Sequence, residues 1–153
     1  MDTVQDFEDL LEVLERFSVR YLVIGGLAFI YHAKPRYTKD MDLWIGPDPE
    51  NVARANQALA AFGSPYLLDP ADSAEILQLG VAPNRIDLLR DPGGVDFDHA
   101  WSRRREGAYG RANAFWIDLD SLIEIKSRIE DPRHQEDARV LRIIRERRDR
   151  EGR

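Results

Sequence analysis

Two aspartates near the start of an expected strand could hold a divalent metal ion. Asp40 and Asp42 lie two residues apart in a run of mostly apolar residues. Because side chains alternate along a strand, both carboxylates project from the same face. Like charges held that close repel each other, and a Mg²⁺ ion between them converts the repulsion into coordination. The alternative is that Asp40 caps a turn and Asp42 lies on a solvated face.

A third carboxylate, Asp87, interrupts the apolar run at residues 85–89. Burial of an unpaired carboxylate is costly, so this side chain needs a partner. If its strand lies beside the strand that carries Asp42, the three acids form a site of the kind used in two-metal phosphoryl and nucleotidyl transfer. The alternative is an ion pair with Arg85 or Arg36.

Gly25 and Gly26 stand between a short apolar strand and a helix. Backbone amides at such a position can point at an anion, and the helix dipole favours negative charge there. Glycine also lets a phosphate approach the backbone closely. The segment lacks the Gly-x-Gly-x-x-Gly and Gly-Lys-Ser/Thr patterns of dinucleotide and P-loop sites, so simple turn geometry is the alternative explanation.

Hydrophobic periodicity predicts the elements that must position these groups. Helices are expected at residues 2–16, 27–33, 49–62, 97–104, 119–129 and 133–147, and strands at residues 19–24, 41–45, 75–79, 85–89 and 114–117. A turn at Pro83 and Asn84 would join two strands, and Asp118 or Asp120 would cap a helix. The order predicts an α/β (α+β) fold, with a small mixed sheet flanked by helices and a C-terminal helical pair.

Composition sets the broad class. A chain of 153 residues with 43% hydrophobic content predicts a single domain over residues 1–153, with a core at about 19–118 and C-terminal helices at about 119–148. The absence of cysteine excludes disulfides and cysteine-based zinc sites, which favours an oxygen-bound cation. No segment approaches the roughly 20 apolar residues of a membrane span, and the start lacks a signal-peptide pattern. These features predict a cytoplasmic protein with no membrane partner.

The formal charge of -6 argues against a protein that coats nucleic acid nonspecifically. Arginines nevertheless cluster at residues 103–105 and again at residues 139–150. The second group is interleaved with acids, so a solvated helix face is one interpretation. An RNA-binding domain that uses this arginine-rich end is the other.

Residues 23–26, 36–43 and 85–89, taken in order, resemble the nucleotidyltransferase (DNA polymerase β-like) superfamily. The double glycine, the helix ending near His32 and the Arg-x-Thr-x-Asp-x-Asp-Leu order are similar to a minimal branch that includes AbiEii-type and MenT-type toxins of toxin–antitoxin systems. The similarity covers about residues 19–140. It implies transfer of a nucleotide from an NTP to RNA, such as a tRNA end, or to a protein hydroxyl, with Mg²⁺ or Mn²⁺ as cofactor and a cognate antitoxin or toxin as partner.

The same resemblance implies roles for individual residues. Asp40, Asp42 and Asp87 would be the catalytic metal ligands, and Lys126 would be a fourth catalytic residue that contacts the triphosphate. The nucleotide contacts would be Gly25, Gly26, Arg36, Thr38, Lys126 and Asp137. An ordinary surface lysine is the alternative for Lys126. His134 stands where many relatives carry an acid, which leaves a noncatalytic nucleotide-binding antitoxin or regulatory subunit as the second hypothesis.

Overall fold

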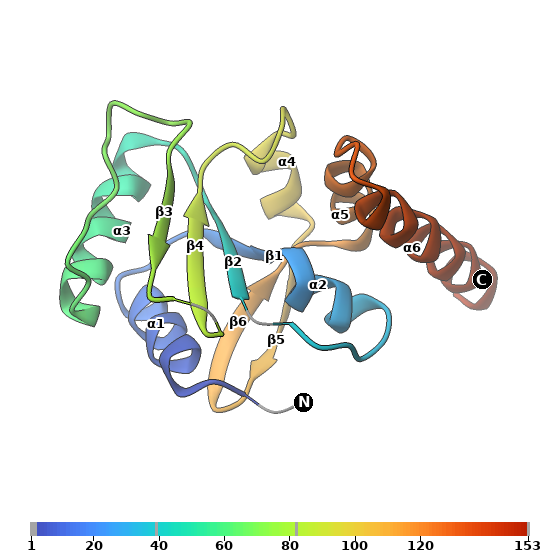
Figure 1. Ribbon diagram of the computed structural model, residues 1–153, viewed down its shortest axis with the longest axis horizontal. Coiled ribbons are helices and arrows are strands. Elements are labelled where there is room, and N and C mark those ends of the chain that lie inside the picture. The colour runs from blue at the N-terminus through green and yellow to red at the C-terminus, as the bar shows by residue number, and fades with distance from the viewer. Residues whose placement is uncertain (1–2, 39, 82, 153) are drawn as a thin grey trace.

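The computed structural model describes residues 3–38, 40–81 and 83–152, and a six-stranded mixed sheet forms its centre (Figure 1). The strands are β1 (Tyr21–Ile24), β2 (Asp40–Ile45), β3 (Ile76–Leu79), β4 (Arg85–Leu89), β5 (Arg105–Tyr109) and β6 (Ala112–Trp116). They lie in the order β3-β4-β2-β1-β6-β5. The pairs β2–β4 and β1–β6 are parallel, and the other three pairs are antiparallel.

Helices cover both faces of this sheet. They are α1 (Gln5–Arg16), α2 (Gly25–His32), α3 (Pro49–Phe62), α4 (Phe97–Ser102), α5 (Leu119–Ser127) and α6 (Pro132–Glu151). Figure 1 shows α1 and α3 on one side of the sheet and α4, α5 and α6 on the other. Helix α2 packs on β1 and β2 and also touches α5 and α6. The result is the predicted α/β fold with its C-terminal helical pair.

The alternation of side chains along the strands divides the buried residues into two clusters. On β1, Tyr21 and Val23 belong to the cluster under α1 and α3, whereas Leu22 and Ile24 belong to the cluster under α4 and α5. Trp44, fully buried, donates a hydrogen bond from its indole to the backbone oxygen of residue 90. Both faces of the central strands are therefore fixed by packing, which pins the register of the residues at their ends.

The predicted elements are present, with ends that shift by a few residues. Helix α3 and strand β4 have the predicted bounds, and Asp118 is the cap of α5, since its side chain accepts a hydrogen bond from the Ser121 amide. Helix α4 ends two residues early, and α6 continues to Glu151. Residue 2, where the first helix was expected to begin, lies outside the described residues.

Two features differ from the prediction in kind. Helix α2 begins at Gly25 rather than at Leu27, so the two glycines form its first turn instead of a separate turn before it. Strand β5 is not predicted, because its sequence Arg-Glu-Gly-Ala-Tyr has little apolar alternation. It is an edge strand that is held by hydrogen bonding to β6 rather than by burial, and such strands carry a weak sequence signal.

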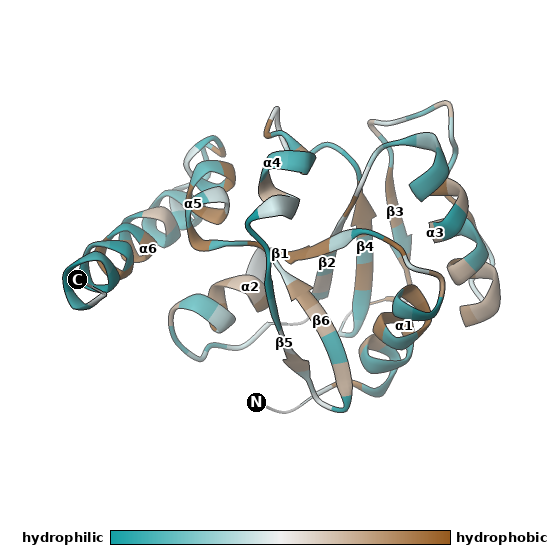
Figure 2. Cartoon of the chain, turned by 180° about the vertical axis from the view of Figure 1, so that it is seen from behind, coloured by the Kyte–Doolittle hydropathy of each residue, from teal (hydrophilic) through white to brown (hydrophobic). Residues whose placement is uncertain are grey.

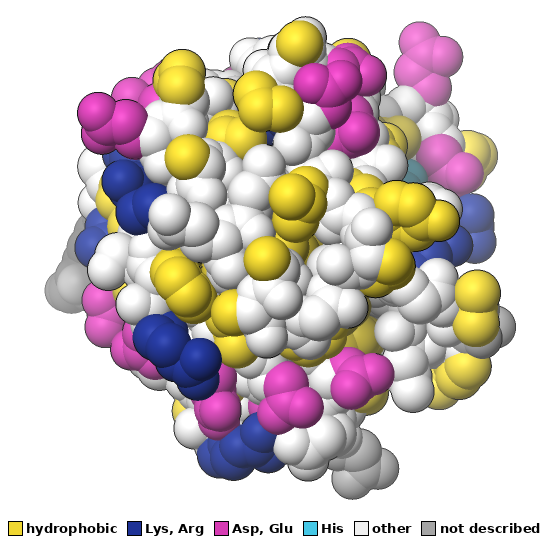
Figure 3. All heavy atoms as spheres, turned by 90° about the vertical axis from the view of Figure 1, so that its left-hand side faces the viewer, with side chains coloured by type: hydrophobic (Ala, Val, Ile, Leu, Met, Phe, Trp, Pro, Cys, Tyr) yellow, Lys and Arg dark blue, Asp and Glu magenta, His cyan; other side chains and the backbone are white. Residues whose placement is uncertain are grey.

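Apolar and hydrophilic residues are distributed unevenly over the fold. In Figure 2 the sheet strands carry much of the apolar colour, and the outer turns of α6 are mostly hydrophilic. Figure 3 shows the side where α3 lies, with apolar side chains in the middle of the face and charged groups of both signs around its margin. In residues 3–38, 40–81 and 83–152, no helix is both long and apolar enough to cross a membrane.

Candidate active site

The three predicted acids meet on one face of two neighbouring strands. Strands β2 and β4 are parallel partners, and the register places Asp42 opposite Asp87 and Asp40 opposite Arg85. The predicted three-acid site requires β2 and β4 to be neighbours, and this adjacency is confirmed. We call Asp40, Asp42 and Asp87, together with Arg85, the acid cluster.

Helix α2 begins directly against this cluster. Gly25 has a φ of +66°, and a Cβ atom built on it would lie 2.1 Å from Oδ2 of Asp42. A Cβ on Gly26 would lie 2.7 Å from Oγ1 of Thr38. Both glycines are therefore required by close neighbours as well as, at Gly25, by backbone conformation. No side chain caps the helix, so its first amides are left to bind an anion.

The carboxylates are crowded enough to alter their ionisation. Burial raises the pKa of Asp42 to about 7, and the charges of Asp87 and Asp40 and a hydrogen bond with Asp87 add to the rise. One oxygen of Asp40, Oδ1, is buried and has no hydrogen-bond partner among the described residues. The cluster therefore holds more negative charge than its surroundings neutralise.

Arg85 supplies the positive charge that this cluster does have. Its Nε donates to Oδ1 of Asp87 at 2.9 Å, and its Nη2 donates to Oδ2 of Asp87 at 3.0 Å and to Oδ2 of Asp40 at 3.1 Å. The ion pair that sequence analysis gave as the alternative for Asp87 is therefore present, with Arg85 and not with Arg36. In the described part of the chain, no three carboxylate or imidazole groups already stand close enough together to hold a metal ion.

A second charged group, the basic cluster, consists of Arg36, Lys126, His134 and Asp137. Asp137 accepts a bidentate pair from Arg36, at 2.8 and 3.0 Å, and a bond of 2.8 Å from Nζ of Lys126. Nδ1 of His134 lies 3.3 Å from the same Nζ. The predicted nucleotide contacts Arg36, Lys126 and Asp137 are thus brought together from a loop and two helices.

The carboxylate of the basic cluster has a pKa shift opposite in direction to that of Asp42 in the acid cluster. Burial would raise the pKa of Asp137, but the hydrogen bonds from Arg36 and Lys126 outweigh it and lower that pKa. Burial and the positive charge of Lys126 lower the pKa of His134. Lys126 is only 2% exposed, so its interpretation as an ordinary surface lysine is wrong. A buried ammonium is expensive unless it is paired, and here the pairing uses a single carboxylate.

One cavity of about 300 Å³ joins the two clusters. Gly25 and Asp42 line one side of this central cavity, and Lys126 and His134 line the other. Apolar residues of the sheet, α5 and the segment after α5 form most of the remaining wall: Ile24, Ile76, Leu89, Leu122, Ile125 and Ile129. Asp91 and Pro92 complete it. A helix amino end, an acid group and a buried lysine therefore face one space that is largely apolar elsewhere.

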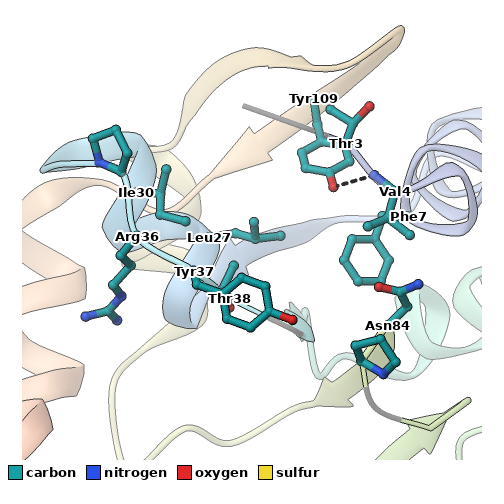
Figure 4. A pocket seen from close by; sticks show the side chains of 12 residues that line it. Thr3, Val4, Phe7, Leu27, Ile30, Arg36, Tyr37, Thr38, Asn84 and Tyr109 are labelled. Atoms are coloured by element: carbon teal, nitrogen blue, oxygen red, sulfur yellow. Dashed lines mark hydrogen bonds between the residues drawn. The ribbon is translucent and has the colours of Figure 1, made fainter.

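A larger pocket of about 430 Å³ lies at the ends of β2 and β4 where these strands begin (Figure 4). Figure 4 shows Leu27 and Ile30 of α2 on one side of this lateral pocket and Val4 and Phe7 of the N-terminal segment on the other. The loop before β2 and the turn before β4 complete it with Arg36, Tyr37, Thr38, Pro83 and Asn84. Thr38 and Asn84 precede the acid cluster by two and one positions in the chain, so this pocket lies beside the segments that lead into β2 and β4.

The two arginine groups of the sequence also meet. Arg103, Arg104 and Arg105 line a surface pocket of about 470 Å³ together with Arg145 and Arg148 of α6. Three aspartates share this pocket, and Asp120 accepts hydrogen bonds from both Arg103 and Arg145. Part of the positive charge is therefore neutralised within the chain.

Comparison with known proteins rests on three-dimensional structure. The sequence matches no protein-family model and no curated protein. The lincosamide antibiotic adenylyltransferase LnuA, in a lincomycin-bound crystal structure, superposes with a TM-score of 0.61 and 17% identity over 94% of this chain and 99% of that chain. An antigenic nucleotidyltransferase-like protein from Paracoccidioides brasiliensis gives a TM-score of 0.51 and 12% identity over 93% of this chain and 76% of that chain.

The chain has a nucleotidyltransferase-like fold. At these identities the likeness concerns the fold, and the chemistry has to be argued from the residues themselves. Within this nucleotidyltransferase-like fold, Asp42 of β2 and Gly25 of α2 line one cavity with Lys126 of α5 and His134 of α6.

Two residues of this nucleotidyltransferase-like fold make contacts that their sequence context does not predict. Arg85 was considered as one of two partners for Asp87, but it also binds Asp40. Asp137 joins Arg36 across 101 residues of sequence, and no local pattern predicts such a contact. His32 has a structural role, since it is buried and its Nε2 lies 2.6 Å from the Ile117 carbonyl oxygen.

Proposed function

We propose that the chain is a metal-dependent nucleotidyltransferase that moves a nucleoside monophosphate from an NTP to a hydroxyl group of RNA, such as a tRNA end, or of a protein. The observation that carries this proposal is the position of Asp42. It stands opposite Asp87, lies against the amino end of α2 at Gly25, and faces Lys126 across the central cavity. Acids, free helix amides and a lysine around one space are the groups that nucleotidyl transfer requires.

Three features of the acid cluster fit a bound Mg²⁺ or Mn²⁺ ion. Its carboxylates are crowded, the pKa of Asp42 is raised by burial and by its acidic neighbours, and Oδ1 of Asp40 has no partner among the described residues. Asp40, Asp42 and Asp87 would hold the ion, as hard oxygen ligands do. When bound, the ion would supply positive charge to the phosphates and remove the repulsion among the acids.

The other residues bind and position the reactants. The amides of Gly25 and Gly26 would donate hydrogen bonds to the triphosphate, and Lys126 and Arg36 would balance its charge. The acceptor oxygen attacks the α-phosphorus, the bond to the β-phosphate oxygen breaks, and pyrophosphate leaves. Asp87 would accept the proton from the attacking hydroxyl. Most of the rate would come from positioning and electrostatics.

The two cavities suggest how the reactants divide. The central cavity contains Lys126 and the helix amino end, which favour the anionic nucleotide. The lateral pocket is lined mostly by apolar and aromatic side chains, with a few polar groups and one arginine, and it lies where β2 and β4 begin. We assign it to the acceptor. The exposed Tyr37 at its edge would provide a ring for a base or an apolar group to stack on.

The inference about the cellular role of this reaction rests only on the resemblance of the sequence to the toxin branch. Similarity to the minimal toxin branch supports a part in a toxin–antitoxin system, with a cognate antitoxin or toxin as partner. A small molecule is a further acceptor to test, since one structural neighbour is a lincosamide antibiotic adenylyltransferase.

The test is label transfer from each of the four α-³²P-NTPs, with Mg²⁺ or Mn²⁺, to total RNA, to a protein lysate and to lincomycin. We expect transfer to at least one acceptor, and a loss of about a thousandfold in Asp42→Asn because that variant keeps the side-chain size but removes a metal ligand. Asp98→Asn is the matched control, since Asp98 is an exposed acid on α4. Equal labelling by Asp42→Asn would disprove the proposed site.

The second candidate is a noncatalytic nucleotide-binding subunit. The ion pairs of Arg85 with Asp40 and Asp87 favour it, because they occupy oxygens that a metal ion would need. Calorimetry with Mg²⁺-ATP distinguishes the two candidates. Binding with no transfer to any acceptor would favour the noncatalytic subunit.

A further inference from the structure

Arg85 has an unusual position for an arginine beside a metal site. Its guanidinium binds both oxygens of Asp87 and one oxygen of Asp40, so it connects the acids of two strands at hydrogen-bond distances of 2.9–3.1 Å. The register requires this arrangement, because Arg85 stands directly opposite Asp40 on the neighbouring parallel strand. A bidentate arginine–carboxylate pair of this kind is among the stronger hydrogen-bonded pairs in proteins.

The oxygens that Arg85 binds belong to two of the three acids that the proposed function assigns to the metal ion. A carboxylate oxygen that accepts a hydrogen bond from a guanidinium has its lone pairs engaged and its charge partly balanced, so its attraction for a second cation falls. Oδ1 of Asp40 lies outside these bonds and has no partner among the described residues. The guanidinium therefore fills part of the acid cluster and leaves part of it open.

Arg85 can also leave without disturbing the core. Its side chain is 33% exposed. Arg85 is the first residue of β4 and follows the turn at Pro83 and Asn84. Arginine has a long stem with several rotatable bonds, so the head group can turn toward solvent or toward a phosphate while the strand stays in place. A phosphate group bound beside the acid cluster would offer it a new anionic partner.

We propose that Arg85 is an intramolecular counterion that occupies the cation position of the acid cluster in the free protein and competes with the divalent metal ion for it. This inference rests on the proposed function, because it presumes that the acids bind a metal. Its consequence is that the free protein binds metal weakly. Metal and nucleotide then bind together, since the nucleotide phosphates provide the displaced guanidinium with another partner.

The experiment measures binding of Mn²⁺ to the whole chain without nucleotide, from the electron paramagnetic resonance signal of free Mn²⁺. Arg85→Gln should bind Mn²⁺ about tenfold more tightly than the natural chain, because the competing charge is gone. Arg85→Lys keeps a charge but loses the bidentate geometry, so it should lie between the two. Arg139→Gln is the control, because Arg139 pairs with Glu136 on the exposed face of α6 and should leave Mn²⁺ affinity unchanged.

Thermal melting provides a second readout. Without metal, Arg85→Gln should melt at a lower temperature than the natural chain because its acids have lost their counterion, and Mn²⁺ should raise its melting temperature by more. If Arg85→Gln does not fold, Arg85→Lys carries the test, with Mn²⁺ affinity about threefold tighter than the natural chain expected. Affinity in Arg85→Lys equal to or weaker than that of the natural chain would then overturn the inference.

The outcomes separate the inference from the proposed function. If the natural chain and Arg85→Gln bind Mn²⁺ with equal, measurable affinity, the metal site stands and the counterion role of Arg85 is overturned. If neither binds Mn²⁺, both the metal site and the role of Arg85 are overturned. Tighter binding in Arg85→Gln, with Arg139→Gln unchanged, supports both.

Discussion

The acid cluster and the basic cluster face the same cavity with opposite excess charge. Among the described residues, Arg85 is the one cation hydrogen-bonded to any of the three acids of the cluster, and it binds Asp40 and Asp87. Across the cavity, two cations, Arg36 and Lys126, share the single carboxylate of Asp137. The acid cluster therefore has excess negative charge, which favours binding of a cation. The basic cluster has excess positive charge, which favours binding of an anion.

This difference explains how one small cavity could receive a metal ion and a triphosphate together. Each cluster contains an internal counterion that stabilises it without a ligand. In neither cluster does this counterion balance all of the charge. The amino end of α2 lies between the clusters, and its amides favour the same phosphates that Lys126 would attract. Substitutions that act on one cluster should therefore leave the binding function of the other largely intact.

The largest effect on ligand binding should come from removing Lys126, the buried cation of the basic cluster. Lys126→Met should weaken binding of a nonhydrolysable NTP with Mg²⁺ about a hundredfold, because a buried charge that faces the phosphates is lost. Arg36 continues to pair with Asp137, so the fold should survive. Binding of Mn²⁺ without nucleotide should change by less than about twofold, since the charge of Lys126 is offset by its ion pair with Asp137.

Isothermal titration calorimetry measures both affinities. Lys34→Met is the matched control, because Lys34 is an exposed lysine in the loop after α2. A parallel loss of metal and nucleotide affinity in Lys126→Met would show that the two clusters do not act separately.

A smaller effect should come from a substitution at Gly25 of α2 that displaces Asp42 of the acid cluster. Gly25→Ala places a Cβ atom where Oδ2 of Asp42 now lies and also forces alanine into a positive φ. We expect Mn²⁺ affinity to fall about tenfold because Asp42 must turn away, together with about 1–2 kcal/mol of lost stability from the backbone.

Gly63→Ala separates these two causes. Gly63 also has a positive φ, of +94°, but a Cβ atom there would have no neighbour within 4 Å. This control should lose similar stability in urea unfolding and keep its Mn²⁺ affinity. A similar loss of Mn²⁺ affinity in both variants would contradict the contact with Asp42 as the cause.

The smallest effect concerns the pH dependence of stability in the metal-free protein. Burial and acidic neighbours raise the pKa of Asp42 to about 7 in the folded state, well above its ordinary value. The folded state therefore retains a proton that the unfolded state releases, and stability is lost as pH rises from about 4 through 7. Asp42→Asn should melt a few degrees higher than the natural chain at pH 8 in EDTA, and this advantage should vanish near pH 4.

Asp120→Asn should show the opposite sign. Burial opposes ionisation of Asp120, but hydrogen bonds from Arg103 and Arg145 outweigh it and lower its pKa. Its ionised form therefore stabilises the fold above pH 4, and the variant should melt lower than the natural chain at pH 8. Melting curves of both variants from pH 4 to 8 test the contrast, which fails if both variants shift in the same direction.

Local sequence patterns determined the parts of the site that depend on short-range geometry. The alternation of a strand places Asp40 and Asp42 on one face, and an isolated acid in the apolar residues 85–89 requires a partner wherever the strand lies. The glycines after β1 mark a close approach of the chain to other atoms. These statements need only a few residues each, so the sequence suffices for them.

Tertiary structure alone decided which of these groups meet. The strand order brings β4 beside β2, so Asp87 faces Asp42 and Arg85 faces Asp40. Pairing between distant strands depends on how the whole core packs, and no periodicity in either strand specifies its neighbour. For the same reason, the contact of Arg36 with Asp137 and the edge strand β5 had no local signal. The sequence contained the charged groups of this site, and packing of the fold decided how they are paired.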